Sequence, residues 1–216
     1  INRARARARK GGRVGAQALR DVQVTRLACE LHRAGCVRFG DFVLHSGAHS
    51  PVYIDLRRLV TYPSLLQEVA RAYVRLLQPL QYDRLAAIPY AALPIGSAVS
   101  LQAGAPMIYP RREAKEYGTR RQIEGEFHAG ERVVLLDDLI TTGGSKLEAM
   151  QPLLAEGLCV EDVVVLIDRE QGGREDLAAH GLAVHAVLTL RELVDYTGRL
   201  IGKRRDGAEV TLTACI

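Results

Sequence analysis

Five short apolar runs, separated by helical stretches, constrain the fold of this chain more than any other feature. The runs lie at 85–88, 106–109, 133–136, 163–167 and 184–188. Patterns typical of helices lie at about 93–103, 144–155, 173–180 and 190–195. Short runs that are apolar throughout are typical of strands buried on both faces. Because such strands alternate with helices here, the sequence predicts an α/β fold with a central parallel sheet flanked by helices.

The residues before this region predict a helix and a hairpin. A helical pattern runs from about Ala18 to His32, and two alternating stretches follow at 39–44 and 52–56. The segment between them, 45–51, is rich in turn-forming residues. Pro63 is well placed in the first turn of a further helix, which is expected to end near Gln78.

The stretch from Arg111 to Gly130 fits neither a helix nor a strand. It is rich in charge and glycine and has little apolar content. A polar stretch of this length inside a compact domain is usually a functional loop or a disordered one. The pattern alone leaves both interpretations open.

The positive charge of the chain is concentrated at its start. The formal net charge is +4, yet residues 1–20 carry six Arg and one Lys without an acid, which leaves −3 for residues 21–216. We expect residues 1–17 to be a basic disordered tail or an inter-domain linker, although such a strip could touch nucleic acid or an anionic surface. It is also compatible with a transit peptide. The chain starts at Ile1 rather than Met, which favours a fragment or a processed form.

Composition predicts a single globular domain for the remainder. Hydrophobic residues make up 48% of the chain and charged residues 25%, and no apolar run is long enough to span a membrane. Four cysteines lie far apart without a Cys-x-x-Cys pair: Cys29, Cys36, Cys159 and Cys215. This spacing argues against a disulfide framework or a zinc site and fits reduced thiols in the cytoplasm. We expect one domain at 18–200 and predict no structure for 201–216.

The most informative local pattern is VVLLDDLITTGGSKLEAM, residues 133–150. Four apolar residues predict a strand, Asp137 and Asp138 follow at its carboxyl end, and 141–145 predicts a turn into a helix. Such a turn directs backbone N–H groups and the helix dipole at one point, which suits a phosphate dianion. The two acids lie too close for a second phosphate but suit the cis hydroxyls of a ribose. We expect both acids on a polar surface turn, where neutralising either leaves the fold intact.

Three alternatives to a phosphorylated sugar can be weighed on this segment. A Walker A loop needs Gly-Lys-Ser/Thr, whereas Lys146 follows Ser145 here. A dinucleotide fingerprint needs Gly-x-Gly-x-x-Gly, which the segment does not contain. The two acids could also be a solvated strand end. Paired acids beside a phosphate-binding turn favour the phosphorylated sugar.

The segment resembles the PRPP (5-phosphoribosyl 1-diphosphate) signature of the type I phosphoribosyltransferases, two acids followed by Thr, then Thr, Ala or Ser, then Gly. Three other segments resemble orotate phosphoribosyltransferases in particular. Residues 39–57 resemble their N-terminal hood, 111–125 their mobile catalytic loop, and 166–173 their orotate-binding strand end. With 88–94, the similarity runs in order over about two-thirds of the chain. It is closest to the phosphoribosyltransferase half of UMP synthases.

The resemblance implies a type I phosphoribosyltransferase fold with a small N-terminal hood at about 18–60. It implies a pentosyltransferase that moves the 5-phosphoribosyl group of PRPP to orotate, giving orotidine 5′-monophosphate and diphosphate in UMP biosynthesis. Mg²⁺ is expected to enter with PRPP, held mainly by substrate oxygens and water rather than by the protein. The transition state resembles an oxocarbenium ion, so the protein acts mainly by stabilising the departing diphosphate and excluding water.

The resemblance also implies the site residues. The PRPP contacts are Arg111, Arg112, Lys115, Tyr117, Asp137, Asp138, Thr141, Thr142, Gly143, Gly144 and Ser145. The orotate contacts are Tyr53, Ile54, Thr141 and Arg169, of which Arg169 is the cation for the orotate carboxylate. The catalytic residues are Lys115, Arg111, Asp137 and Asp138. Candidate contacts to the diphosphate are His45 and Tyr90.

Three positions depart from the family pattern. His45 replaces a Lys that is usual in the hood, Ala91 stands where many bacterial members have Lys, and Ala87 stands where Gly is common. Two cations fewer could weaken diphosphate binding, but neither loss removes the central machinery.

Two other functions remain open at this point. One is a non-catalytic relative that binds PRPP or nucleic acid, and the other is a transferase for a different base, such as uracil or a purine. Lys115 and the paired Arg residues favour the orotate enzyme. The resemblance further implies a homodimer with shared active sites, and a decarboxylase for orotidine 5′-phosphate that is either fused or associated. We expect a cytoplasmic protein without a membrane or nucleic-acid partner.

Overall fold

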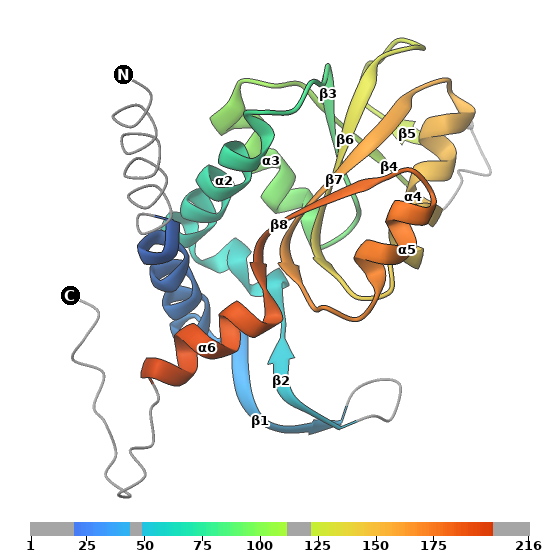
Figure 1. Ribbon diagram of the computed structural model, residues 1–216. Helices are drawn as coiled ribbons and strands as arrows, with labels where there is room; N and C mark the ends of the chain where they lie inside the picture. Colours follow the sequence, from blue (N-terminus) through green and yellow to red (C-terminus); the bar gives the residue numbers. More distant parts are fainter. Residues whose placement is uncertain (1–19, 44–48, 112–121, 201–216) are drawn as a thin grey trace, which may run out of the picture.

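The computed structural model describes residues 20–43, 49–111 and 122–200, which form a central sheet with helices on both faces (Figure 1). The sheet has six strands in the order β5-β4-β3-β6-β7-β8. Their bounds are Arg84–Ala87 (β3), Met107–Pro110 (β4), Ile123–Glu124 (β5), Arg132–Ile140 (β6), Cys159–Asp168 (β7) and Ala183–Thr189 (β8). Every neighbouring pair is parallel except β4 and β5. The predicted parallel α/β sheet is confirmed.

Helices cover the sheet in two layers. A helix over residues 20–33, α2 (Pro63–Leu77) and α3 (Ala92–Ala103) lie on one face, and α4 (Gly144–Ala155) and α5 (Gly173–Ala179) lie on the other (Figure 1). The last helix, α6 (Leu190–Leu200), follows β8. Helix α2 is strongly amphipathic, and the residues that it buries include Leu65, Val69 and Tyr73.

Two hydrophobic cores lie on opposite faces of the central strands. In β6, Val134 and Leu136 belong to the core under α2 and α3. Val133 and Leu135 belong to the core under α4 and α5. Successive residues of a strand point to opposite faces, so a strand with both faces covered must be apolar throughout. This is the physical reason for the continuous apolar runs.

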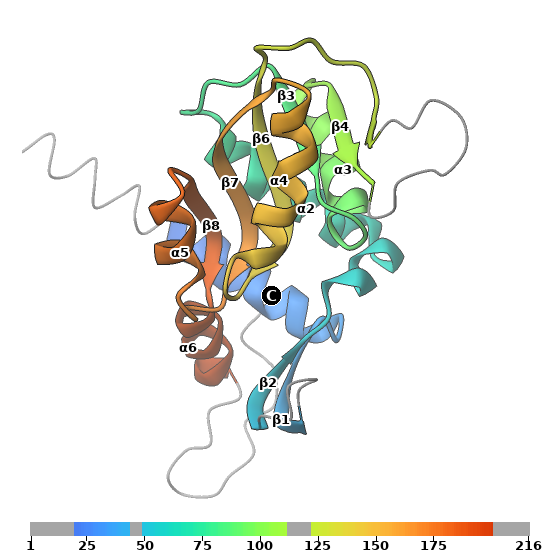
Figure 2. The ribbon, with the colours of Figure 1, turned by 90° about the vertical axis from the view of Figure 1, so that its right-hand side faces the viewer.

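A small hairpin lies beyond the end of the sheet at which β7 and β8 finish (Figures 1 and 2). It consists of β1 (Val37–Val43) and β2 (His49–Ile54), which pair antiparallel. Val37 and Val52 on one side of the hairpin are buried in the core of the α2 face. A 3₁₀ helix, η1 (Leu56–Thr61), connects the hairpin to α2. This unit lies within the stretch 18–60 expected to form the hood, whereas the helix over residues 20–33 packs on the α2 face of the sheet.

The structure corrects three details of the predicted elements. The stretch 111–130 contains a short strand, β5, which pairs antiparallel with β4 at the edge of the sheet. Residues 49–51, expected in a turn, belong to β2. Strand β6 continues past the two acids to Ile140, because it keeps pairing with β7 as far as Asp168. Asp137 and Asp138 are therefore strand residues, and the predicted surface turn is wrong.

Three cysteines lie in the described part of the chain. Cys29, Cys36 and Cys159 are free thiols, the first two buried. Burial raises the pKa of the Cys36 thiol to about 11, which keeps it protonated and unreactive at neutral pH. None of the helices within the described ranges has the length and apolar character needed to cross a membrane.

Candidate active site

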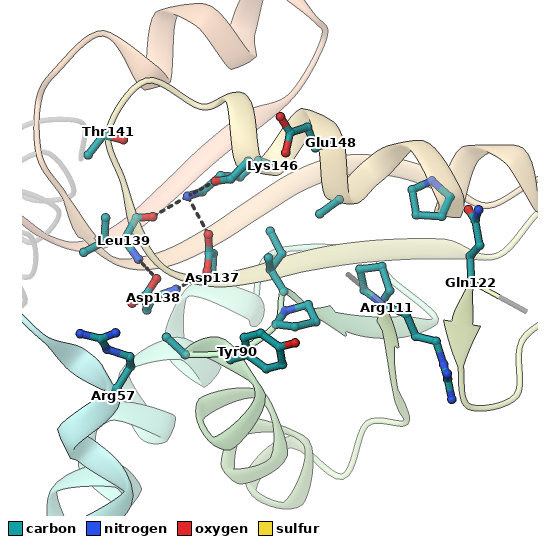
Figure 3. Close-up of a pocket in the computed structure, with 17 residues that line it drawn as sticks. Arg57, Tyr90, Arg111, Gln122, Asp137, Asp138, Leu139, Thr141, Lys146 and Glu148 are labelled. Atoms are coloured by element: carbon teal, nitrogen blue, oxygen red, sulfur yellow. Dashed lines mark hydrogen bonds and ion pairs between the residues drawn. The ribbon is translucent and has the colours of Figure 1, made fainter. Parts of the chain in front are cut away.

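A cavity of about 520 Å³ opens at the carboxyl end of β6 (Figure 3). Its volume suits a small ligand, and ligands of open α/β sheets bind outside the carboxyl ends of the strands. Several predicted site residues line it: Tyr90, Arg111, Asp137, Asp138, Thr141 and Ser145. Arg57 and Lys146 also line it, although no binding role was predicted for either.

The turn between β6 and α4 presents backbone N–H groups to this cavity. Gly143 is the N-cap of α4 and has a φ of 91°, a conformation that favours glycine. Among the described residues, no side chain caps the start of α4. The N–H of Lys146 donates to the carbonyl of Gly143 at 2.8 Å, so the N–H groups of Gly144 and Ser145 are the ones that an anion could use. Thr141 and Ser145 line the cavity, whereas Thr142, Gly143 and Gly144 do not.

The turn 141–145, which is predicted to bind phosphate, is held from behind by the start of α5. A Cβ atom at Gly173 would collide with the carbonyl oxygen of Thr141 and with the side chain of Ile140. Only glycine therefore allows α5 to approach the turn this closely. The contact limits the movement of the turn away from the cavity.

Asp137 is buried under α4. Its side chain alternates with Val133 and Leu135 along β6, which places it on the α4 face. One carboxylate oxygen lies 2.6 Å from Nζ of Lys146. Asp137 and Lys146 are only 7% and 3% exposed. Substitution of Asp137 would leave a buried ammonium without its partner, so the expectation that a neutral residue there leaves the fold intact rests on a wrong premise.

Asp138 points to the opposite face of β6 and into the cavity. Its Oδ1 accepts a hydrogen bond of 2.9 Å from the N–H of Leu139, and its own N–H donates to Oδ1 of Asp137 at 2.9 Å. Within the described ranges Asp138 forms no ion pair. Burial, followed by the charge of Asp137, raises the pKa of Asp138 to about 7. Asp138 can therefore change protonation near neutral pH.

Two arginines bring positive charge to the cavity from opposite sides. Arg57, in η1, donates from Nε to Asp55 at 2.7 Å, yet its side chain is 69% exposed. Asp55 and, more weakly, Asp138 raise the pKa of Arg57 above its ordinary value. Arg111 pairs with Glu124. Nothing in the sequence marked Arg57 beyond its place at the end of the hood-like stretch.

The backbone of Arg111 also closes the base of the predicted catalytic loop. Its N–H donates to the carbonyl of Gln122 at 2.7 Å, next to the pairing of β4 with β5. The loop residues Arg112, Lys115 and Tyr117 lie outside the described residues, as does His45 of the hood. Tyr90 lines the cavity and is 65% exposed.

Of the predicted orotate contacts, Thr141 lines this cavity, whereas Tyr53, Ile54 and Arg169 do not. Tyr53 and Ile54 are the last residues of β2. The N–H of Arg169, just after β7, donates to the carbonyl of Ile140 at 3.0 Å, which places Arg169 beside the phosphate-binding turn. Its Nε is buried and has no hydrogen-bond partner among the described residues.

The turn that carries Arg169 is fixed by its neighbours. Asp168 is 4% exposed and accepts hydrogen bonds from the N–H of Glu170 at 2.8 Å and from Nε of Arg174 at 3.2 Å. Glu170 has a φ of 54°, in the left-handed region that non-glycine residues rarely adopt. Such strain persists only where surrounding contacts hold it.

Comparisons with known proteins identify the family. A family model for the phosphoribosyl transferase domain matches residues 57–182. The bifunctional enzyme PyrF/PyrE of Nostoc sp. is 43% identical over 87% of this chain and 39% of that protein. Uridine 5′-monophosphate synthase of Bos taurus is 41% identical over 79% of this chain and 36% of that protein. The chain thus spans about two-fifths of the length of these two relatives.

Shorter relatives match over most of their length. The orotate phosphoribosyltransferase of Caenorhabditis elegans is 37% identical over 83% of this chain and 80% of that protein. The match therefore extends well beyond the phosphate-binding turn.

Solved structures agree with the sequence matches. The UMP synthase of Leishmania donovani has a TM-score of 0.77 at 45% identity, covering 85% of this chain and 40% of that chain. The orotate phosphoribosyltransferase of Aeropyrum pernix has a TM-score of 0.72 at 35% identity, covering 80% of this chain and 98% of that chain. The orotate phosphoribosyltransferase of Mycobacterium tuberculosis in complex with PRPP has a TM-score of 0.65 at 29% identity, covering 79% of this chain and 98% of that chain. The fold is that of the type I phosphoribosyltransferases, and the chain belongs to the orotate phosphoribosyltransferase family.

Proposed function

We propose that this chain transfers the 5-phosphoribosyl group of PRPP to orotate, giving orotidine 5′-monophosphate and diphosphate in UMP biosynthesis. One observation carries the proposal: Thr141 and Ser145, from the turn between β6 and α4, line one cavity at the carboxyl end of β6 together with the acids Asp137 and Asp138. A phosphate site beside a ribose site is what a phosphoribosyl donor requires. The family supports orotate as the acceptor.

The chemistry follows from the distribution of charge around the cavity. The turn 141–145 would bind the 5′-phosphate, and the two acids would accept hydrogen bonds from the ribose hydroxyls. As the C1′–oxygen bond to diphosphate breaks, positive charge grows on the ribose and negative charge on the leaving group. Arg111 would stabilise the leaving diphosphate together with Arg112, Lys115 and Tyr117. A ring nitrogen of orotate then forms the new bond to C1′ and loses its proton to water or to the departing diphosphate.

Mg²⁺ is the cofactor that we propose. Among the described residues, no group of three or more His, Cys, Asp or Glu side chains is placed to hold a metal ion. The cavity is lined by three acids, Asp137, Asp138 and Glu148, of which Asp137 is already paired with Lys146 and Glu148 is exposed. This donor set fits an ion that arrives with PRPP and is held by its oxygens and water. When bound, the ion would supply charge neutralisation of the diphosphate.

We place the base beside Arg169, with backbone contacts from Tyr53 and Ile54. A buried guanidinium nitrogen without a partner costs free energy, and the carboxylate of orotate is a group that could use it. A guanidinium can also bind a carboxylate through two parallel hydrogen bonds, which a base without a carboxylate cannot form. This contact would separate orotate from uracil and from purines.

Arg169→Ala is expected to raise KM for orotate by about 10- to 100-fold, because hydrogen bonds to charged groups contribute about 1.5–3 kcal/mol. KM for PRPP should change by less than about threefold. Steady-state kinetics with each substrate varied in turn give both values. Arg191→Ala is the matched control, since Arg191 is near the same turn but its side chain is 80% exposed. A larger effect on PRPP than on orotate would place Arg169 in the other half of the site.

The longer relatives suggest how the chain works in the cell. We propose that it is fused to, or associated with, a decarboxylase for orotidine 5′-monophosphate, in line with the bifunctional relatives. We also propose a homodimer with shared active sites. The free buried thiols of Cys29 and Cys36 support a reducing, cytoplasmic setting.

The decisive test is diphosphate release from PRPP and Mg²⁺ with each candidate base. Orotate alone should support release, whereas uracil, adenine and hypoxanthine should not. Release with another base instead would assign a different acceptor. Tight PRPP binding without release from any base would identify a regulatory protein and contradict the proposed activity.

A further inference from the structure

Lys146 is an unusual residue for its position in the fold. It lies in the first turn of α4, where the helix dipole is positive and a cation is unfavourable. Its side chain is nevertheless 3% exposed, although lysine is seldom fully buried. A buried ammonium at a helix N-terminus is destabilised by the loss of solvation and by the helix dipole, so its environment must offset both effects. The contacts of this side chain show how that is done.

All three ammonium hydrogens of Lys146 have acceptors. Nζ lies 2.6 Å from Oδ2 of Asp137, 2.5 Å from the carbonyl oxygen of Leu139 and 3.3 Å from Oγ of Ser145 (Figure 3). These acceptors come from the end of β6 and from the phosphate-binding turn. The side chain therefore crosses behind the turn and joins its two ends, with an acid of the PRPP signature as the charged partner.

The pairing makes the two acids unequal. Asp137 faces α4 and meets Lys146, whereas Asp138 faces the other side of β6 and lacks an ion pair within the described ranges. The acids are linked, because the N–H of Asp138 donates to the second oxygen of Asp137. Both oxygens of Asp137 are thus engaged, one by Lys146 and one by the N–H of Asp138. The side chain of Asp138 lies beside that of Asp137 and meets no cation in the described part of the chain.

We infer that Lys146 is a positioning residue for phosphoribosyl transfer: it neutralises and fixes Asp137 and the turn 141–145, and leaves Asp138 as the less constrained of the two acids that meet the ribose. The inference rests on the proposed function for its substrate, PRPP. Its structural part, the dependence of Asp138 on Lys146, can be tested without turnover.

The charged and titratable groups that face Asp138 come from four elements. Asp137 is its neighbour in β6, Lys146 approaches from α4, Tyr73 from α2 and Arg57 from η1. Burial and the charge of Asp137 raise the pKa of Asp138, and Lys146 opposes this rise. Removal of Lys146 should therefore raise this pKa further, because it removes an opposing cation and leaves a second acid without a counter-charge.

The first experiment compares Lys146→Met with the wild type by ¹³C NMR of labelled aspartate side chains across pH 5–9. Methionine keeps the length of the side chain and removes its charge. In the wild type one carboxyl should titrate near pH 7, and Asp138→Asn identifies it. In Lys146→Met this titration should move to higher pH. An unchanged titration would overturn the inference, whatever the activity of the protein.

The second experiment is a double-mutant cycle on PRPP kinetics. Lys146→Met should raise KM for PRPP by about tenfold or more at pH 7, while kcat changes by less than about threefold. The difference in KM between the variant and the wild type should become smaller by pH 9. In an Asp137→Asn background the same substitution should raise KM for PRPP by less than about a further threefold, because Lys146 then has no acid to position. Full multiplication of the two effects would show that Lys146 acts directly on the 5′-phosphate instead.

Thermal unfolding separates positioning from simple loss of structure. Lys146→Met leaves a buried acid unpaired and should lower Tm, whereas Asp137→Asn/Lys146→Met removes both charges and should recover much of the loss. Its KM for PRPP should nevertheless stay as high as that of Asp137→Asn. Recovery of KM together with Tm would mean that Lys146 serves stability alone. Failure of the wild type to turn over orotate and PRPP would refute the proposed function but leave the NMR result to decide on Lys146.

Discussion

Asp138→Asn is expected to make the protein more stable and less active at the same pH. Burial and the neighbouring charge of Asp137 raise the pKa of Asp138 from its ordinary 3.8 to about 7. Above pH 7 the folded protein must therefore hold a charge that its surroundings disfavour. Asparagine keeps the shape of the side chain and an oxygen that can accept the hydrogen bond from Leu139, but it carries no charge.

The sign of the pH dependence follows from proton uptake. Between about pH 4 and 7 the folded state holds a proton on Asp138 that the unfolded chain has released, so the free energy of unfolding falls as pH rises through this window. Above pH 7 it stays at the lower value. The asparagine variant lacks this loss. The difference in free energy of unfolding between the asparagine variant and the wild type should be near zero at pH 4 and reach its full value at pH 8.

A shift of this size corresponds to about 2–4 kcal/mol at pH 8, since each pKa unit is worth about 1.4 kcal/mol. For a chain of this length that is roughly 5–10 °C in Tm. Thermal unfolding at pH 4 and pH 8 measures both values. Glu148→Gln is the matched control, because it removes the same formal charge from the exposed rim of the same cavity. An equal increase in Tm at pH 4 and pH 8 would show that burial of the charged Asp138 side chain does not destabilise the protein.

The same substitution should lower kcat/KM for PRPP by about 10- to 100-fold. The interaction that we propose for Asp138 is a charge-assisted hydrogen bond from a ribose hydroxyl, and its loss should cost about 1.5–3 kcal/mol. A residue whose replacement raises stability and lowers activity is held in place for function rather than for folding. Wild-type kinetics in the asparagine variant would remove Asp138 from the ribose site.

The sheet and the turn from β6 into α4 could be predicted because their signals are local. Each buried strand is a continuous apolar run, and the turn is contiguous in sequence from Thr141 to Ser145. The edge strand β5 was missed because two residues, Ile123 and Glu124, are too few to show a pattern. Its formation depends on β4 lying beside it, which is a tertiary effect.

The inequality of the two acids was not predicted, although part of its signal was in the sequence. Adjacent residues of a strand point to opposite faces, and the apolar residues Leu139 and Ile140 show that β6 continues beyond Asp138. The partner of Asp137 could not be predicted in the same way. A lysine in the first turn of a helix is usually exposed, and Lys146 is buried only because β6 extends beneath α4. Arg57 likewise reaches the cavity through the placement of η1.

A large effect is also expected when two inactive variants are mixed. The proposed dimer places Lys115 of one subunit over the acids of its partner. Residues 112–121 contain six charged side chains and little apolar surface, so their ordering has to be offset by contacts with a charged ligand or another subunit. Lys115→Ala would then leave a good ribose site, and Asp138→Asn would leave a good loop. Asp138 is the better choice than Asp137, because its replacement does not strand the buried charge of Lys146.

In a mixed dimer of Lys115→Ala and Asp138→Asn, one site would combine the two intact halves and the other would carry both defects. Each mixed dimer should show about half of wild-type activity. Random exchange of equal amounts makes about half of the dimers mixed, so the bulk should reach about a quarter. Native mass spectrometry measures the extent of exchange, and diphosphate release measures the activity.

The double variant Lys115→Ala/Asp138→Asn, mixed with wild type, gives the opposite test. If Lys115 acts across the dimer, each site of a mixed dimer has one damaged half, and both sites fail. With equal amounts and random exchange, only the wild-type homodimers remain active, about a quarter of all dimers. If Lys115 serves its own subunit, every wild-type subunit stays active and the bulk keeps about half. The two models therefore predict different pairs of values: both mixtures keep about a quarter of the activity if the site is shared, whereas the first keeps almost none and the second about a half if the sites are separate. The second pair of values, with exchange complete, would contradict the shared-site dimer.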